Sequence, residues 1–308
     1  MRRPSAGIWE NSGVILTRGI LPALATPIDA SGVVQTKPLE ALIERLYQAG
    51  VHGLYVAGQT GEGWQLDSAQ RKLLAEVAVR NSPKGAQVMI HVGAMRVAEA
   101  IDLARHAGEI GASSVSSLPP PGAGNGAELL DWYGRLASAS PLPLYVYYFP
   151  GLSPAVKRCE DLLALCRLEN VAGLKYTADD LDWMSELIRH GANVMFGRDE
   201  VLASALLLGA QGGIGTFYNL VPEWLLELYG HAQAGRWTEA AQVGERVRRL
   251  IHVCLPYQVL SAAKVILRWQ GFDCGPVLSP RLNNTPEQEE RLRADLIREG
   301  FAEVIEPR

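Results

Sequence analysis

The sequence predicts an α/β protein built as a (β/α)8 barrel, the TIM-barrel architecture, with a C-terminal helical extension. Eight short apolar segments follow one another along the chain, with helical patterns between them. The segments are nearly continuous rather than alternating, as in parallel strands covered on both faces. From Thr238 onward only helical patterns remain. We therefore expect an N-terminal extension at 1–17, a barrel at 18–235 and a helical extension at 236–308, with a doubly wound parallel sheet as the alternative.

The predicted strands are short apolar runs, several of them rich in the valine, isoleucine and tyrosine that suit a buried sheet. In order they are LPALAT at 21–26, GLYVAG at 53–58, VMIHVG at 88–93, SSVSSLP at 113–119, PLYVYYFP at 143–150, AGLKYT at 172–177, VMFG at 194–197 and GGIGTF at 212–217.

The predicted helices show apolar residues at the spacing of one helical face. Between the strands they include 38–49, 68–81, 97–110, 126–137 and 180–189, and in the extension they are 239–253, 258–270 and 286–299. The irregular loop LPPPGAGNGAE at 118–128 follows the fourth strand, which in a barrel places it at the active face.

Composition excludes several classes of function. The 308 residues are 48% hydrophobic and carry a net charge of −4, with no lysine and arginine run to neutralise phosphates. A nucleic-acid partner is therefore not expected. The longest apolar run, at 201–210, is too short to cross a bilayer, so no membrane association is expected either.

The cysteines and the N-terminal region indicate a reducing compartment. No cysteine pair has CxxC spacing, so we expect reduced core residues and no metal site; the four are Cys159, Cys166, Cys254 and Cys274. Trp9, Glu10 and Asn11 interrupt any apolar stretch that could act as a signal peptide. The predicted location is the cytoplasm.

Two residues at the ends of consecutive strands suggest amine chemistry. Lys175 ends an apolar run, where burial would lower the pKa of its ammonium and free an amine that can attack a keto group. Tyr147, 28 positions earlier, could relay the protons that imine formation requires. Taken alone, Lys175 could equally be an ion-paired or snorkelling lysine, and Tyr147 a core tyrosine.

Two further motifs follow predicted strands. GQTGEG at 58–63 can turn backbone N–H groups and the Thr60 hydroxyl toward a carboxylate, or it can be a tight turn. It lacks the Gly-Lys-Ser/Thr ending of a phosphate-binding loop. In GRDE at 197–200, Asp199 and Glu200 could accept hydrogen bonds from substrate hydroxyls, or Asp199 could cap the next helix. His91 is expected to be a hydrogen-bonded core residue.

Together these residues resemble the dihydrodipicolinate synthase/N-acetylneuraminate lyase family of class I, pyruvate-dependent Schiff-base aldolases. The resemblance runs from about Arg18 to Leu296 and is carried by GQTGEG, YYFP and GLKYT with the spacing between Tyr147 and Lys175. It implies a barrel with a helical extension, a homo-oligomer that is a tetramer or a dimer, and chemistry that needs neither a metal nor an organic cofactor.

Carried over residue by residue, the resemblance assigns roles to the strand-end residues. Lys175 would form the imine with pyruvate or another 2-keto acid, Tyr147 would relay protons, and Thr60 with the Gly61 backbone would hold the carboxylate. The catalytic set is thus Lys175, Tyr147 and Thr60, and the substrate-binding set is Gln59, Gly61, Thr177, Gly197, Asp199, Glu200, Gly215 and Thr216.

Details of the sequence favour the N-acetylneuraminate lyase branch. Leu152 stands where the synthases place an arginine for the second substrate's carboxylate, and GRDE resembles the sugar-contacting pattern of the lyases. Gln59 departs from the serine or threonine of the family motif, and the loop at 118–128 lacks the tyrosine that many members use there. Of the three tyrosines in YVYYFP, Tyr145 should share the face of Tyr147 but lie deeper, and Tyr148 should point the other way.

The predicted activity is therefore reversible cleavage of a sugar acid such as N-acetylneuraminate into pyruvate and an aldehyde or sugar. The alternatives are a dihydrodipicolinate synthase, a 2-keto-3-deoxy sugar-acid aldolase or dehydratase, 4-hydroxy-2-oxoglutarate aldolase, and a keto-acid-binding barrel without turnover. Arg198 could serve a substrate with a second carboxylate or be a solvated side chain.

Overall fold

The structure is a computed structural model that describes residues 16–308. Residues 1–15 lie outside the described part of the chain, and with them lies most of the predicted N-terminal extension at 1–17. The prediction about a signal peptide, which rests on Trp9, Glu10 and Asn11, also falls outside it.

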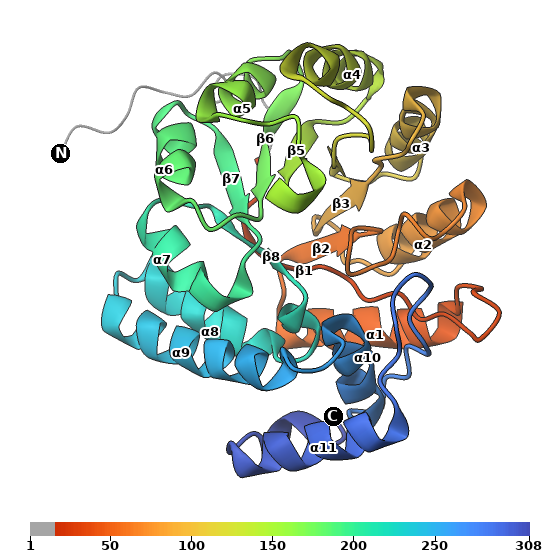
Figure 1. The fold of residues 1–308 in the computed structure, drawn as a ribbon, viewed down its shortest axis with the longest axis vertical. Coiled ribbons are helices and arrows are strands. Elements are labelled where there is room, and N and C mark those ends of the chain that lie inside the picture. The colour runs from red at the N-terminus through yellow and green to blue at the C-terminus, as the bar shows by residue number, and fades with distance from the viewer. Residues whose placement is uncertain (1–15) are drawn as a thin grey trace.

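Eight parallel strands form a nearly closed barrel with helices around it (Figure 1). The strands lie in the order β1-β8-β7-β6-β5-β4-β3-β2. Between β1 and β2, the Leu24 N–H donates to the Tyr55 carbonyl at 2.9 Å and the His52 N–H donates to the Ile20 carbonyl at 3.0 Å. These bonds bring the two ends of the sheet together. The barrel prediction is confirmed, and the doubly wound alternative is wrong.

The strands alternate with helices along the chain. The strands are β1 (Gly19–Pro22), β2 (Gly53–Val56), β3 (Gln87–His91), β4 (Ser114–Ser117), β5 (Leu144–Tyr148), β6 (Val171–Tyr176), β7 (Asn193–Phe196) and β8 (Gly212–Gly215). The helices between and after them are α1 (Thr36–Ala49), α2 (Ser68–Arg80), α3 (Val97–Glu109), α4 (Gly126–Ala139), α5 (Cys159–Cys166), α6 (Leu181–Arg189), α7 (Leu202–Leu207) and α8 (Pro222–Gln233).

Sequence and structure differ most at the first strand and at the shortest helices. β1 begins before the predicted segment 21–26, because residues 19–22 pair in register with Gly212–Gly215 of β8. Beyond Pro22 only a single bridge, from Ala23 to Tyr55, continues the pairing. Helices α5 and α7 have eight and six residues, too few for helical periodicity to stand out.

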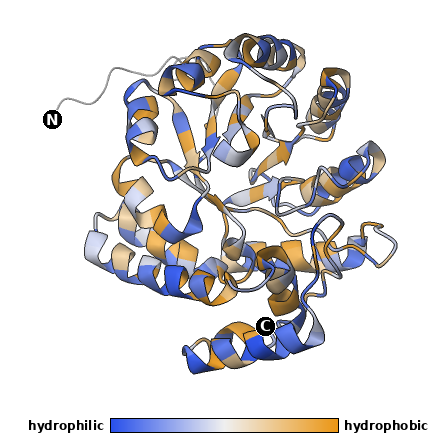
Figure 2. Cartoon of the chain, in the orientation of Figure 1, coloured by the Kyte–Doolittle hydropathy of each residue, from blue (hydrophilic) through white to orange (hydrophobic). Residues whose placement is uncertain are grey.

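Apolar side chains pack in two layers, one inside the barrel and one between strands and helices. The inner layer includes Tyr55, Met89, Tyr147 and Met195. The outer layer is larger and is continuous from α1 to the C-terminal helices. Figure 2 shows the hydrophobic strands at the centre and hydrophilic residues on the outer faces of the helices. In such a barrel the functional polar side chains are expected at the carboxyl ends of the strands.

Three helices follow the barrel, α9 (Trp237–Cys254), α10 (Val259–Trp269) and α11 (Pro286–Arg298), as the sequence predicted. α9 lies along α8 in Figure 1, and buries Val247 and Leu250. Within residues 16–308 no single helix has the length and apolar character to span a membrane. The pair α9 and α10 meets those criteria only when joined, and it bends by 107°.

Candidate functional site

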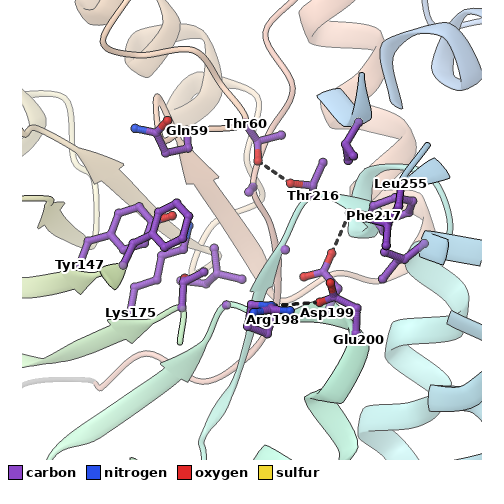
Figure 3. Close-up of a pocket in the computed structure, with 18 residues that line it drawn as sticks. Gln59, Thr60, Tyr147, Lys175, Arg198, Asp199, Glu200, Thr216, Phe217 and Leu255 are labelled. Atoms are coloured by element: carbon purple, nitrogen blue, oxygen red, sulfur yellow. Dashed lines mark hydrogen bonds and ion pairs between the residues drawn. The ribbon is translucent and has the colours of Figure 1, made fainter. Parts of the chain in front are cut away.

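A cavity of about 230 Å³ opens at the carboxyl ends of the strands (Figure 3). All predicted site residues except Gly61 line it, together with Arg198, four apolar residues of the barrel mouth and three residues of α9, α10 and the turn between them. The barrel residues are Ala23, Phe149, Ile214 and Phe217, and the helical residues are Ile251, Leu255 and Val259.

Lys175 lies in β6 and projects into this cavity. β6 is held in register with β5, so that Lys175 pairs with Tyr147. The Lys175 side chain is only 4% exposed, and its Nζ lies 3.9 Å from the ring centroid of Tyr55 and 4.2 Å from that of Tyr147. Burial lowers the pKa of Lys175 from 10.5 to about 7, although Asp199 opposes the shift. A large share of this lysine is therefore a free amine at neutral pH.

Tyr147 is the phenol beside the amine that also lines the cavity. Burial raises the pKa of Tyr147 to about 12, so the phenol is protonated at rest and ready to donate. Its ring stands edge-on to Tyr55, with ring centroids 6.1 Å apart, and edge-on to His91 at the same distance. This packing fixes the phenol beside Lys175.

The other two tyrosines of YVYYFP have structural contacts, as their positions along the strand predicted. Tyr145 lies deeper in the barrel, where its hydroxyl accepts a hydrogen bond from the Thr17 N–H at 2.8 Å. Tyr148 points outward and packs against Tyr176 and Trp183, at centroid distances of 5.3 Å and 6.3 Å. His91 is also a core residue, and its Nε2 accepts from the Leu118 N–H at 3.1 Å.

Two threonine hydroxyls meet on the opposite wall. Oγ1 of Thr60, in the loop after β2, lies 2.7 Å from Oγ1 of Thr216, which follows β8. Gly61 does not line the cavity, because its carbonyl is turned back to accept a hydrogen bond from Thr26 Oγ1 at 2.7 Å. The role of the Gly61 backbone in carboxylate binding therefore stays a prediction.

Asp199 is a buried carboxyl group on the third side of the cavity. Its Oδ2 accepts from the Phe217 N–H at 2.9 Å. Burial raises the pKa of Asp199 from 3.8 to about 7. The alternative that Asp199 caps the next helix is wrong, because α7 starts after Val201 and has no side-chain cap.

Gly197 and Gly215 are required by the close approach of polar side chains. A Cβ on Gly197 would lie 1.9 Å from Thr177 Oγ1, and a Cβ on Gly215 would lie 1.9 Å from Asp199 Oδ1. Thr177 Oγ1 is buried, and within residues 16–308 it makes no hydrogen bond of normal geometry. It lies close enough to the Tyr147 hydroxyl to offset part of the rise that burial causes in the pKa of that phenol.

Arg198 is not a free cation. Its guanidinium forms ion pairs with Asp179 and, at 3.4 Å, with Glu200. These two carboxylates neutralise its charge. The contacts favour a hydroxylated ligand over one with a second carboxylate at this end of the cavity.

A buried ion pair behind the loop at 58–63 was not predicted from the sequence. Glu62 of GQTGEG is fully buried, and its Oε1 lies 2.7 Å from Nζ of Lys264 in α10, whose side chain is 2% exposed. The signal that marked Lys175, a lysine in an apolar run, is also present in α10 as SAAKVIL. Only the partner, about 200 positions away, could not be found from the sequence.

Gln59 has a partner from the C-terminal region as well. Arg281 Nη2 donates to the Gln59 carbonyl at 3.2 Å and to Gln59 Oε1 at 3.1 Å. Nothing in the sequence near Arg281 indicated this contact. In the described residues, no group of three or more His, Cys, Asp or Glu side chains is placed to hold a metal ion.

Comparison with known proteins identifies the family. Residues 16–299 match the dihydrodipicolinate synthetase family. The chain belongs to this family. It is 32% identical to the N-acetylneuraminate lyase of Rhizobium meliloti, over 85% of this chain and 88% of the relative.

Solved structures agree with this membership. The N-acetylneuraminate lyase of Proteus mirabilis superposes with a TM-score of 0.86 at 27% identity, and the match covers 93% of this chain and 100% of that one. A dihydrodipicolinic acid synthase family protein from Escherichia coli, solved in complex with pyruvate, gives a TM-score of 0.85 at 25% identity, with 94% and 100% covered. The chain is a lyase of this aldolase family.

Proposed function

We propose that this enzyme reversibly cleaves N-acetylneuraminate, or a closely related sugar acid, into pyruvate and an amino-sugar aldehyde through an imine on Lys175. The observation that carries the proposal is the buried Lys175 amine, with a pKa lowered to about 7, 4.2 Å from the ring centroid of Tyr147. The likeness to the lyases of Rhizobium meliloti and Proteus mirabilis supports the substrate class.

The reaction begins at the keto carbon of the open-chain sugar acid. The neutral Lys175 amine adds to this carbon, and the hydroxyl of the resulting carbinolamine leaves as water, giving a protonated imine. A base then removes the proton of the hydroxyl on the second carbon from the imine carbon, and the bond between that hydroxyl-bearing carbon and the carbon next to the imine breaks. The electron pair flows into the imine, releasing the aldehyde and leaving an enamine on Lys175.

Protonation of the enamine carbon and hydrolysis complete the cycle. One water returns to the imine carbon, pyruvate departs, and Lys175 becomes an amine again, so the net change is cleavage of one carbon–carbon bond. We assign these proton transfers to Tyr147. Its pKa of about 12 in the free enzyme makes it a donor, and the positive imine beside it would lower that pKa and help it to act as a base.

The cavity divides naturally between the two ends of this substrate. The hydroxyls of Thr60 and Thr216 face the carboxylate end, together with Gln59. Thr177, Asp199 and Glu200 provide acceptors and a hydroxyl for the sugar chain, beside Gly197 and Gly215. A carboxylic acid with a pKa near 7 can both donate to and accept from sugar hydroxyls.

The first experiment is reductive trapping. Enzyme is treated with pyruvate and sodium borohydride, and the adduct is mapped by peptide mass spectrometry, with Lys175→Ala as the control. We expect a reduced pyruvyl adduct on Lys175 alone, and release of pyruvate when N-acetylneuraminate is supplied. No adduct on folded wild-type protein would favour a binding protein without turnover. An adduct without cleavage of N-acetylneuraminate would point to another sugar acid.

Assembly and location complete the proposal. The family resemblance implies a homo-oligomer, either a tetramer or a dimer, and the cysteines and the N-terminal sequence predict the cytoplasm. Both stay predictions, and analytical ultracentrifugation of the purified protein tests the first.

A further inference from the structure

We propose that Arg281 is a positioning residue for 2-oxo acid binding, because it links the C-terminal segment 274–284 to the carboxylate-binding loop at 58–63. The inference deepens the proposed function and rests on it. The segment runs between α10 and α11, outside the barrel, and reaches the loop at two separate points.

The first point is the buried end of the loop. Glu62 Oε2 accepts a hydrogen bond from the Leu278 N–H at 2.6 Å, while its Oε1 pairs with Lys264 at 2.7 Å. Lys264 Nζ also donates to the Pro276 carbonyl at 2.7 Å. Because Glu62 and Lys264 are almost fully buried, these bonds are protected from water and fix the segment against the loop.

The second point is the cavity end of the loop. Arg281 donates from Nη2 to both the carbonyl and the side-chain oxygen of Gln59. Its Nε is buried without a partner in residues 16–308, so within them Gln59 supplies all the hydrogen bonds of this guanidinium. Gln59 lines the cavity beside Thr60, so a fixed Gln59 also fixes the start of the turn that carries the Thr60 hydroxyl.

The segment itself is well anchored, and this lets it act as a support. The Cys274 carbonyl accepts from the Ile28 N–H at 3.1 Å. Asn283 Oδ1 accepts from the Val277 N–H at 2.9 Å, closing the segment on itself. The Asn284 N–H donates to Ser261 Oγ in α10 at 2.8 Å. Arg281 is thus held from both sides.

The positive charge of Arg281 should also strengthen binding of a 2-oxo acid. Arg281 lies close enough to Tyr147 to offset part of the rise that burial causes in the pKa of that phenol. A cation behind the loop would also favour the carboxylate of a 2-oxo acid over a neutral ligand. Removing Arg281 should therefore weaken binding of the 2-oxo acid while leaving Lys175 in place.

The test measures how borohydride trapping at Lys175 depends on pyruvate concentration. The variants are Arg281→Met, Arg281→Lys, Gln59→Ser and the double variant Arg281→Met with Gln59→Ser. The exposed Arg291→Met in α11 is the matched control. Circular dichroism verifies that each variant is folded.

Arg281→Met should raise the pyruvate concentration at half-saturation about tenfold, with much less change in the limiting trapping rate. Arg281→Lys keeps the charge but not the forked geometry, so its half-saturation concentration should lie between those of the wild type and Arg281→Met. In the Gln59→Ser background, Arg281→Met should raise the pyruvate concentration at half-saturation by a clearly smaller factor, because the two residues act together.

Each contrary result has a distinct meaning. If the wild type traps pyruvate but Arg281→Met has an unchanged half-saturation, the inference is wrong and the proposed function stands. An equal loss in both Gln59 backgrounds would overturn the action of Arg281 through the Gln59 side chain and would support its bond to the Gln59 carbonyl as the link to the loop. Absence of an adduct on the wild type would overturn the proposed function and this inference with it.

Discussion

Burial of Lys175 sets the chemistry that its amine can perform. Its neighbours are the rings of Tyr55 and Tyr147, which can attract a cation through their faces but cannot replace the water that an ammonium group loses on burial. The result is a pKa near 7. An apolar strand ending in lysine suggested this from the sequence, and Tyr147 at the end of the preceding strand added weight to it, whereas Lys175 taken alone left an ion-paired or snorkelling lysine open.

The first prediction concerns the pH dependence of imine formation. Only the neutral amine attacks, and the fraction of neutral amine grows as pH rises through the pKa of Lys175, which is about 7. The initial rate of adduct formation with pyruvate should therefore rise with pH and level off above about pH 8. Sodium cyanoborohydride, which tolerates mild acid, allows the rate to be measured on both sides of the midpoint. A midpoint near 10.5, the ordinary lysine value, would contradict the burial argument.

At the scale of elements, α10 is tied to the loop after β2 by the ion pair between Glu62 and Lys264. Lys264→Met would leave the Glu62 carboxylate buried without its counter-charge, and we expect a loss of about 3–5 kcal/mol in the free energy of unfolding. Urea denaturation measures this loss. The matched control is Lys72→Met, because Lys72 forms a partly exposed pair with Asp102, whose loss should cost less than about 1 kcal/mol. Similar losses in the two variants would show that burial does not strengthen the pair.

Elements with a long, regular pattern could be predicted from the sequence, and irregular ones could not. The strand from Val171 to Tyr176 stands out as part of a nearly continuous apolar run, and helices such as α9 stand out because their apolar spacing repeats over many residues. α7 is too short for this, and the segment 274–284 has no regular structure at all. Arg281 was missed for that reason: its contact with Gln59 depends on a tertiary path that neither periodicity nor a local motif encodes.

At the scale of the whole molecule, the site belongs to the barrel and the C-terminal helices together. The residues to which we assign catalysis come from the ends of strands or the loops that follow them, as the alternation of strands and helices predicted, whereas part of the wall comes from Ile251, Leu255 and Val259. The outer apolar layer also runs without a break from the barrel into α9 and α11, through residues such as Val247 and Leu292. In the described residues the C-terminal helices have no core separate from this outer layer.

This shared core leads to the last prediction, that the predicted barrel at 18–235 and extension at 236–308 unfold together. Unfolding of one part would expose apolar side chains of the other to water, so partly unfolded states should be scarcely populated. Far-ultraviolet circular dichroism and tryptophan fluorescence should report the same midpoint on heating, and the calorimetric and van't Hoff enthalpies should agree. Repeating the scans at several protein concentrations separates subunit dissociation from unfolding of the chain. A first transition confined to α9, α10 and α11 in hydrogen exchange would mean that these helices dock on an independently stable barrel, and that the wall they provide can open without loss of the catalytic residues.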